Sequence, residues 1–144
     1  PPTSVDLWRA GLVFDGRTAA IRLFADDLLV GRGRAPFTLE AWVRTLAHGR
    51  RMVLLDFGAA GAHQGGTLSL TAEGRLAFDL RGWAGPVSSV ALHDGLWHHV
   101  AVVADDGLLR LHVDGQSSGE ARAPAIDLRS GPAAIGATVE HTDR

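Results

Sequence analysis

Two adjacent histidines and one aspartate offer the clearest route to acid–base chemistry in this sequence. His98 and His99 lie in an alternating apolar stretch, so they should point to opposite faces of a strand and cannot both ligate one ion. If residues 97–104 pair with 108–113 in a hairpin, His99 lies directly across from Asp114, and a His–Asp pair is half of a hydrolase triad. A serine nucleophile would have to complete the triad, but the chain has no G-x-S-x-G elbow. A hydrolase using His99 is therefore the least favoured of our functional hypotheses.

Several aspartates fall in predicted loops, where carboxylates and backbone carbonyls could bind calcium. No D-x-D-x-D cluster connects them, and the Asp-Gly pairs at 94–95 and 106–107 are typical of turns. We therefore expect no obligatory cofactor, keep calcium as the one candidate ion, and assign no metal ligands. The loop acids are Asp26, Asp27, Asp94, Asp105 and Asp106.

A loop tryptophan is the best candidate for contact with a ligand. Trp83 lies in the segment RGWAGP, close to Arg81 and between two predicted strands. An exposed tryptophan beside an arginine could stack on a sugar ring or anchor a protein partner. The alternative is that the ring folds back as a lid over one end of the domain. We take Trp83 and Arg81 as candidate ligand-binding residues, and we expect substitution of Trp83 to change stability little.

The composition excludes several classes of protein. Of the 144 residues, 46% are hydrophobic and 21% charged, as in an ordinary globular domain. A net charge of −2 without a basic block argues against nucleic acid, and no apolar run approaches the ~20 residues that cross a bilayer. The absence of cysteine excludes disulfides and thiolate metal sites. All cations are arginines, and Lys, Asn and Tyr never occur, which indicates a GC-rich bacterial genome.

The elements that must position these residues are strands. Short apolar–polar alternation between glycines recurs along the chain, and no stretch keeps a period of 3.6 with caps over three turns. This pattern predicts an all-β fold, a two-sheet antiparallel β-sandwich. The predicted strands are 11–14, 19–24, 37–44, 51–57, 66–71, 75–81, 87–93, 97–104, 108–113, 117–122 and 132–137.

Two hairpins can be predicted to the level of register. Asp106-Gly107 suits a two-residue type I′ turn, and residues 72–74 suit a three-residue loop with a left-handed Gly74. Each register brings apolar residues together on one face, and a shift by one residue would break both faces. The predicted pairs are Val100–Val113, Val102–Leu111, Leu70–Leu76 and Leu68–Phe78.

In order and spacing, the segments resemble the laminin G-like domains of the concanavalin A-like lectin/glucanase superfamily, especially its bacterial branch. The segments that carry the resemblance are GLVFDG (11–16), FTLEAWV (37–43), GRLAF (74–78), DGLWHHVAV (94–102), LRLHVDG (109–115) and AIG (134–136). The resemblance implies a jelly-roll domain over 11–144, with 1–10 as a lead-in or edge strand. It also implies structural roles for the signature residues Phe14, Asp15, Gly16, Trp42, Trp97, His99, Asp114 and Gly115.

The resemblance also bears on catalysis. Glucan-cleaving relatives carry E-x-D-x-x-E on a strand, which places carboxylates on one face as nucleophile and acid. That spacing does not occur here, where Glu40, Asp56 and Asp79 are solitary acids on separate predicted strands. We therefore expect no enzyme activity.

The family pattern normally continues past the A-I-G strand to a closing segment, F-x-G-x-I-D-E-V-R, which does not occur before Arg144. The sequence also begins with Pro1-Pro2 and not with Met. From both observations we expect that the chain is a piece of a larger protein. A missing strand leaves an open sheet edge, which we expect around residues 11–14. We expect that edge to self-associate or to capture another segment, residues 3–9 being one candidate.

The best interpretation is a non-catalytic recognition or adhesion module that binds a glycan or protein partner through its loops or an exposed sheet face. The alternative is a structural domain that positions a neighbouring catalytic or effector domain of the parent protein. Analogy with the family suggests an extracellular or cell-surface location. We expect neither nucleic-acid binding nor membrane insertion.

Overall fold

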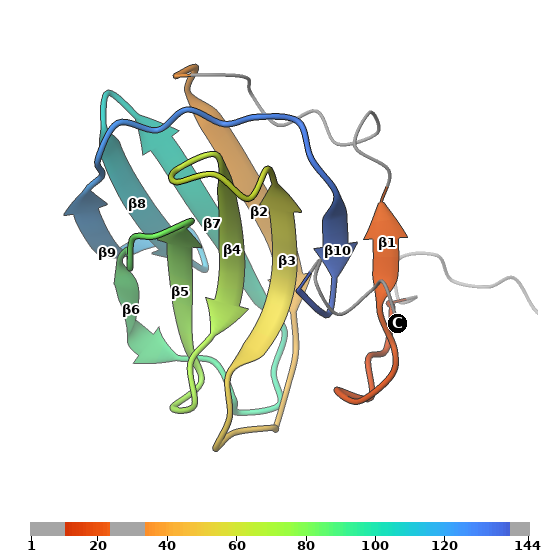
Figure 1. Cartoon of the computed structure of the whole chain (residues 1–144). Coiled ribbons are helices and arrows are strands. Elements are labelled where there is room, and N and C mark those ends of the chain that lie inside the picture. Colours follow the sequence, from red (N-terminus) through yellow and green to blue (C-terminus); the bar gives the residue numbers. More distant parts are fainter. Residues whose placement is uncertain (1–10, 24–33, 139–144) are drawn as a thin grey trace, which may run out of the picture.

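The computed structural model describes residues 11–23 and 34–138, which form ten β-strands in two antiparallel sheets (Figure 1). These residues contain no helix long and apolar enough to cross a membrane. The six-stranded sheet has the order β1-β10-β3-β4-β5-β6, and the four-stranded sheet has the order β2-β7-β8-β9. This confirms the predicted sandwich. The strands are β1 (Ile21–Leu23), β2 (Phe37–Val43), β3 (Met52–Gly58), β4 (Gly65–Leu70), β5 (Arg75–Leu80), β6 (Val87–Ala91), β7 (His98–Asp105), β8 (Leu108–Val113), β9 (Gln116–Arg122) and β10 (Ala133–Ile135).

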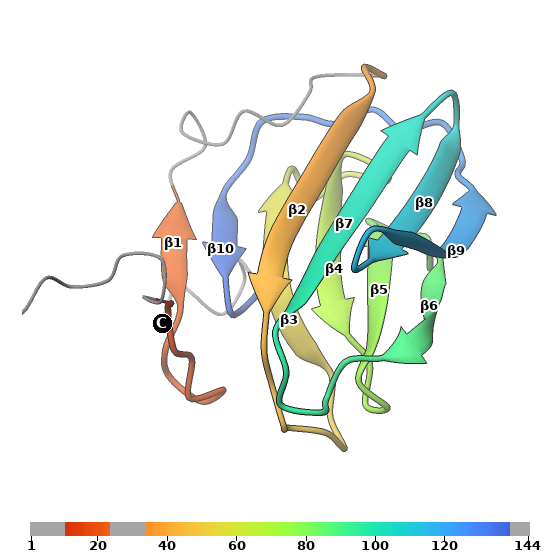
Figure 2. The ribbon, with the colours of Figure 1, turned by 180° about the vertical axis from the view of Figure 1, so that it is seen from behind.

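The two sheets differ in width, which leaves one side of the sandwich thinner than the other. In Figure 2 the four-stranded sheet lies in front, and β1 and β10 extend past β2 with no strand of the smaller sheet before them. Inward-facing Leu39, Ala41 and Val43 of β2 are accordingly only half-buried. At the opposite side, β6 and β9 come together and close the sandwich.

Alternating apolar residues of the two sheets form the core. Phe57, Phe78, Leu70 and Leu76 of the larger sheet and residues of β7 and β8 are almost wholly removed from water. The ring of Phe78 lies between Phe37 and Phe57, with centroids 6.2 and 6.3 Å away. Burial of such side chains is the main driving force for the fold.

Both predicted hairpin registers are confirmed. Val100 pairs with Val113 and Val102 with Leu111, while β4 and β5 pair Leu70 with Leu76 and Leu68 with Phe78. The turn residues Asp106 and Gly107 both have positive φ, at 47° and 70°, as a type I′ turn requires. Gly74 is left-handed, with φ of 73°.

The prediction of a strand at residues 11–14 is wrong. The carboxylate of Asp15 accepts hydrogen bonds from the N–H groups of Arg17, Thr18 and Ala19, at 2.8–2.9 Å, and these bonds hold the chain in a turn. They also place the pKa of Asp15 well below its usual range. Within the described ranges residues 11–14 pair with no strand, and the outer strands on this side of the sandwich are β1 and β2. The expectation of an open edge stays a prediction.

Candidate functional site

The carboxylate of Asp114 engages the ring of His98, whereas we predicted His99. Asp114 Oδ2 lies 2.8 Å from His98 Nδ1, and Asp94 Oδ1 lies 3.0 Å from His98 Nε2. Asp114 Oδ1 accepts the backbone N–H of His99 at 2.9 Å. Asp114, with φ of 50°, starts the turn after β8, so its carboxylate reaches back to the start of β7. The predicted His99–Asp114 dyad is therefore wrong.

The Asp94–His98–Asp114 clamp has a consistent charge state. Hydrogen bonds to the carboxylates of Asp114 and then Asp94 raise the pKa of His98. The backbone N–H of Leu96 and then His98 lower the pKa of Asp94, and His98 and then the backbone N–H of His99 lower the pKa of Asp114. Both ring nitrogens face carboxylate oxygens, an arrangement that favours the protonated ring. The clamp ties the loop before β7 to the turn after β8 and is a structural device.

The ring of His99 instead belongs to the outer face of the four-stranded sheet. Register places it opposite Trp42, and the two ring centroids are 5.3 Å apart. His99 Nε2 lies 3.3 Å from Glu40 Oε2 on the same face. The indole of Trp42 is 64% exposed, which is unusual for the largest apolar side chain. An accessible aromatic surface thus lies beside a carboxylate and an imidazole.

One step along the same face, Arg44 lies over Trp97. The guanidinium carbon is 5.3 Å from the ring centroid, a cation–π arrangement, and Trp97 is 50% exposed. Because side chains in a strand alternate, Trp42 and Arg44 share a face with Trp97 and His99 of the neighbouring chain segment. We call this group the Trp42 patch: Glu40, Trp42, Arg44, Trp97 and His99.

Trp83 and Arg81, the predicted ligand-binding residues, lie at a different place. The chain turns at Gly82. The backbone N–H of Leu80 donates to the carbonyl of Trp83, and the N–H of Trp83 donates to the carbonyl of Leu80. The side chain of Trp83 is partly buried against the core. Trp83 is half-buried, so the expectation of an exposed loop tryptophan is wrong, and the role of Trp83 and Arg81 in ligand binding stays a prediction. Arg81 donates to the buried carboxylate of Asp56 at 2.7 Å.

Asp56 and Asp79, which we treated as solitary acids, lie in one row on the outer face of the six-stranded sheet. Thr67 of β4 stands between them, opposite both residues. Asp56 is 1% exposed and accepts hydrogen bonds from Thr67 and Arg81. Asp79 pairs with Arg51 at 2.8 Å. Each carboxylate thus has its own arginine, as in a structural ion-pair network.

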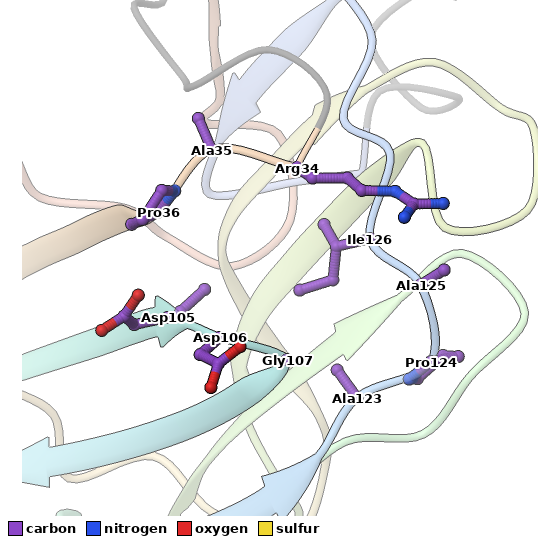
Figure 3. Close-up of a pocket in the computed structure, with 11 residues that line it drawn as sticks. Arg34, Ala35, Pro36, Asp105, Asp106, Gly107, Ala123, Pro124, Ala125 and Ile126 are labelled. Atoms are coloured by element: carbon purple, nitrogen blue, oxygen red, sulfur yellow. The ribbon is translucent and has the colours of Figure 1, made fainter.

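A shallow hollow of about 320 Å³ lies at one end of the sandwich, between the start of β2, the β7–β8 turn and residues 123–126 (Figure 3). Its walls are mostly Ala, Pro, Gly and Ile, with Arg34, Asp105 and Asp106. In Figure 3 the two carboxylates and the guanidinium point in different directions. No three His or acidic groups of the described ranges converge on an ion position. Of the other predicted loop acids, Asp94 is held by His98, and Asp26 and Asp27 lie outside the described residues.

The remaining signature residues have structural partners. The ring of Phe14 packs against Gly136, where a side chain would collide with it, and Arg50 donates to the carbonyl of Gly16 at 3.1 Å. Gly115 completes the turn after β8, with φ of 79°. Phe14, Gly16 and Gly115 thus take part in contacts and turns of the fold.

A sequence profile of the Concanavalin A-like lectin/glucanases superfamily matches residues 15–144, nearly the whole described fold. The chain is a laminin G-like member of this superfamily. No curated protein sequence matches it.

Solved structures of laminin G-like and related domains share the fold. The LG4-5 domains of the mouse laminin α1 chain are 24% identical, with a TM-score of 0.62 over 78% of this chain and 32% of that one. CBM40 of the Ruminococcus gnavus IT-sialidase, bound to α2,3-sialyllactose, is 17% identical, with a TM-score of 0.60 over 74% of this chain and 65% of that one. This laminin G-like chain therefore spans about a third of the laminin fragment and just under two thirds of the sialidase module.

The sequence already contained the signal for the Trp42 patch. Alternation in FTLEAWVR places Thr38, Glu40, Trp42 and Arg44 on one face of a strand. The family resemblance led us to treat Trp42 and Trp97 as framework residues, and in the structure Trp42 is 64% and Trp97 50% exposed. Which face of an edge strand is covered depends on the neighbouring strands, and alternation alone does not reveal it.

Proposed function

We propose that this laminin G-like chain is a non-catalytic recognition module that binds a carbohydrate on the Trp42 patch. The observation that carries the proposal is the 64% exposed indole of Trp42 on a sheet face, flanked by Glu40 and His99. The apolar C–H face of a sugar ring stacks on an indole, and its hydroxyl groups bond to carboxylate and imidazole groups nearby. A superfamily neighbour whose structure holds sialyllactose supports the ligand class.

The arrangement of acids supports a non-catalytic role. Glycosidases use two carboxylates that flank one bond, roughly 5–9.5 Å apart. On the Trp42 patch Glu40 is the one carboxylate, and its ionic neighbour is His99. The acids of the six-stranded sheet lie on its outer face and are paired with Arg81 and Arg51. The patch thus resembles a stacking surface with hydrogen-bonding groups at its side.

A glycan array followed by calorimetry tests the proposal. Trp42→Ala should weaken binding of the best array ligand by at least about tenfold, as expected for an aromatic at the centre of a binding site. Val90→Ala is the matched control, because Val90 is an exposed apolar residue of β6, on the other sheet. If Trp83→Ala abolishes binding and Trp42→Ala does not, the proposal is wrong, and the binding site lies at the loop that contains Arg81.

A structural domain remains the second candidate, favoured by one observation. Leu12, Val13, Leu46 and Leu96 are all at least 63% exposed and lie near Trp97 at the end of β2. Exposed apolar side chains gathered in one area are typical of protein interfaces. If the array yields no ligand and the chain binds tightly to a flanking domain of the parent protein, the structural role is favoured over glycan recognition.

A further inference from the structure

We propose that Asp106 is a modification site, at which the chain converts slowly to isoaspartate through a cyclic imide with Gly107. Asp-Gly is the dipeptide in which this reaction is least hindered, because glycine has no side chain to shield its backbone nitrogen. The dipeptide occurs four times in the chain, at 15–16, 94–95, 106–107 and 114–115. Hydrogen bonds hold three of these carboxyl groups, and that of Asp106 is the exception.

The carboxylate of Asp15 is held by its own turn. It accepts the backbone N–H groups of residues 17–19 at 2.8–2.9 Å and the hydroxyl of Thr18 at 2.9 Å. The N–H of Ala19, ahead of the others, lowers the pKa of Asp15. Attack on a carboxyl group removes one of its oxygens as water, which requires the acid form. A carboxylate that is kept ionised and bonded is therefore protected.

The clamp around His98 protects the next two sites. Asp94 and Asp114 both contact the ring of His98, at 3.0 and 2.8 Å, and Asp94 also accepts the N–H of Leu96 at 2.8 Å. The nitrogen that would attack Asp94 is occupied as well, because the N–H of Gly95 donates to a carbonyl of the β2–β3 loop at 3.0 Å. Reaction at either site requires these bonds to break first.

Asp106 differs in each of these respects. Asp106 and Gly107 are both exposed in the β7–β8 turn. In the part of the chain that the structure describes, the carboxylate of Asp106 has no hydrogen-bond or ionic partner, and the N–H of Gly107 has no acceptor. Both reacting groups are therefore available, and water can reach the imide once it has formed.

The reaction needs water and no other reagent. The backbone nitrogen of Gly107 attacks Cγ of the protonated Asp106 carboxyl group. The N–Cγ bond forms, and the amide proton leaves with the carboxyl hydroxyl as water. Water then opens the cyclic imide. Opening at Cγ restores aspartate, whereas opening at the main-chain carbonyl gives isoaspartate, in which the main chain runs through Cβ and Cγ.

The product does not fit the turn between β7 and β8. The extra main-chain carbon enters a two-residue type I′ turn, which tolerates little change in length. It should displace the carbonyl of Gly107 from the N–H of Ala123, which donates to it at 2.8 Å. Trp42 pairs with His99 near the other end of β7, so the Trp42 patch should stay intact. This inference does not depend on the proposed glycan function.

Peptide mapping of the folded chain by mass spectrometry, after long incubation near neutral pH and well below the Tm, tests the proposal. Methyl transfer from S-adenosylmethionine by an isoaspartyl methyltransferase detects the product at each site. Isoaspartate should accumulate at Asp106 about tenfold faster than at the other three sites, since each of those must first release two or more hydrogen bonds. In the chain unfolded in urea the four sites should react at similar rates.

Asp106→Glu keeps the charge and should remove the product at this site, because a glutamate would have to form a larger ring. The other three sites should be unchanged in this variant, and near-ultraviolet circular dichroism confirms that it keeps its fold. Isoaspartate that forms in the folded chain as fast at Asp15, Asp94 or Asp114 overturns the proposal. So does a folded chain in which Asp106 does not react, or an unfolded chain with the same preference, because the sequence and not the structure would then select the site.

Discussion

At the scale of single residues, His98 shows how a polar side chain can join two turns of the sandwich. Its two ring nitrogens contact Asp94, before β7, and Asp114, after β8, at 3.0 and 2.8 Å. Charge-assisted hydrogen bonds of this kind are stronger than neutral ones. The side chain of His98 is 13% exposed, so the clamp is partly shielded from water.

The clamp predicts a pH-dependent stability. The folded-state pKa of His98 is raised, so its contribution is fully present below its unfolded pKa, about 6.5, and is lost as pH rises through the folded value. The lowered pKa values of Asp94 and Asp114 give a contribution that is present above about pH 4 and lost in acid. The Tm difference between the natural chain and His98→Gln should therefore be greatest near pH 5–6 and shrink towards pH 9. A difference that is constant across this range would contradict the clamp.

Trp83 leads to a second prediction at this scale. Because its indole packs against the core, Trp83→Ala should lower the free energy of unfolding by about 2–3 kcal/mol, less than for a fully buried tryptophan. This reverses our expectation from the sequence. Chemical denaturation measures it, with Val87→Ala on exposed β6 as the control. An unchanged unfolding midpoint would place the ring in solvent.

At the scale of elements, the closed side of the sandwich depends on close contact between β6 and β9. A Cβ on Gly119 of β9 would lie 2.6 Å from the carbonyl oxygen of Val87, which is too close for any side chain. Gly119→Ala should therefore destabilise the fold by about 1–3 kcal/mol, as overpacking does. Ser117→Ala, exposed on the same strand, should change stability by less than ~0.5 kcal/mol. Equal stabilities of the two variants would show that the sheets do not close here.

The sequence could predict those elements in which a turn and an alternating pattern agree. Asp106-Gly107 and Gly74 define two turns, and only one register then keeps the apolar residues together. The strand at 11–14 could not be distinguished from a turn, because the apolar run there is short and Asp15 provides competing hydrogen bonds. The sequence could not show whether Asp114 contacts the ring of His98 or that of His99. The answer depends on the direction of the Asp114 side chain just beyond the end of β8, and strand alternation does not determine that direction.

At the scale of the whole molecule, the unequal widths of the sheets explain where the exposed groups gather. In the described part of the chain the four-stranded sheet ends at β2, and Thr38, Glu40 and Trp42 on the outer face of that strand are exposed. Trp42, Arg44 and Trp97 therefore lie in solvent at one side, while the β6–β9 side is closed. The proposed recognition face lies on the side of the sandwich where the four-stranded sheet ends.

The location of the binding surface can be measured directly from the indole N–H signals of the four tryptophans. Each gives one peak in a ¹H–¹⁵N spectrum, and each peak can be assigned by single Trp→Phe substitutions. We predict that titration with the best array ligand shifts the Trp42 peak saturably, with a smaller shift of Trp97 and none of Trp83. Saturable shifts of Trp83 with Trp42 unmoved would contradict the account, and so would the absence of a saturable shift of Trp42 with any glycan.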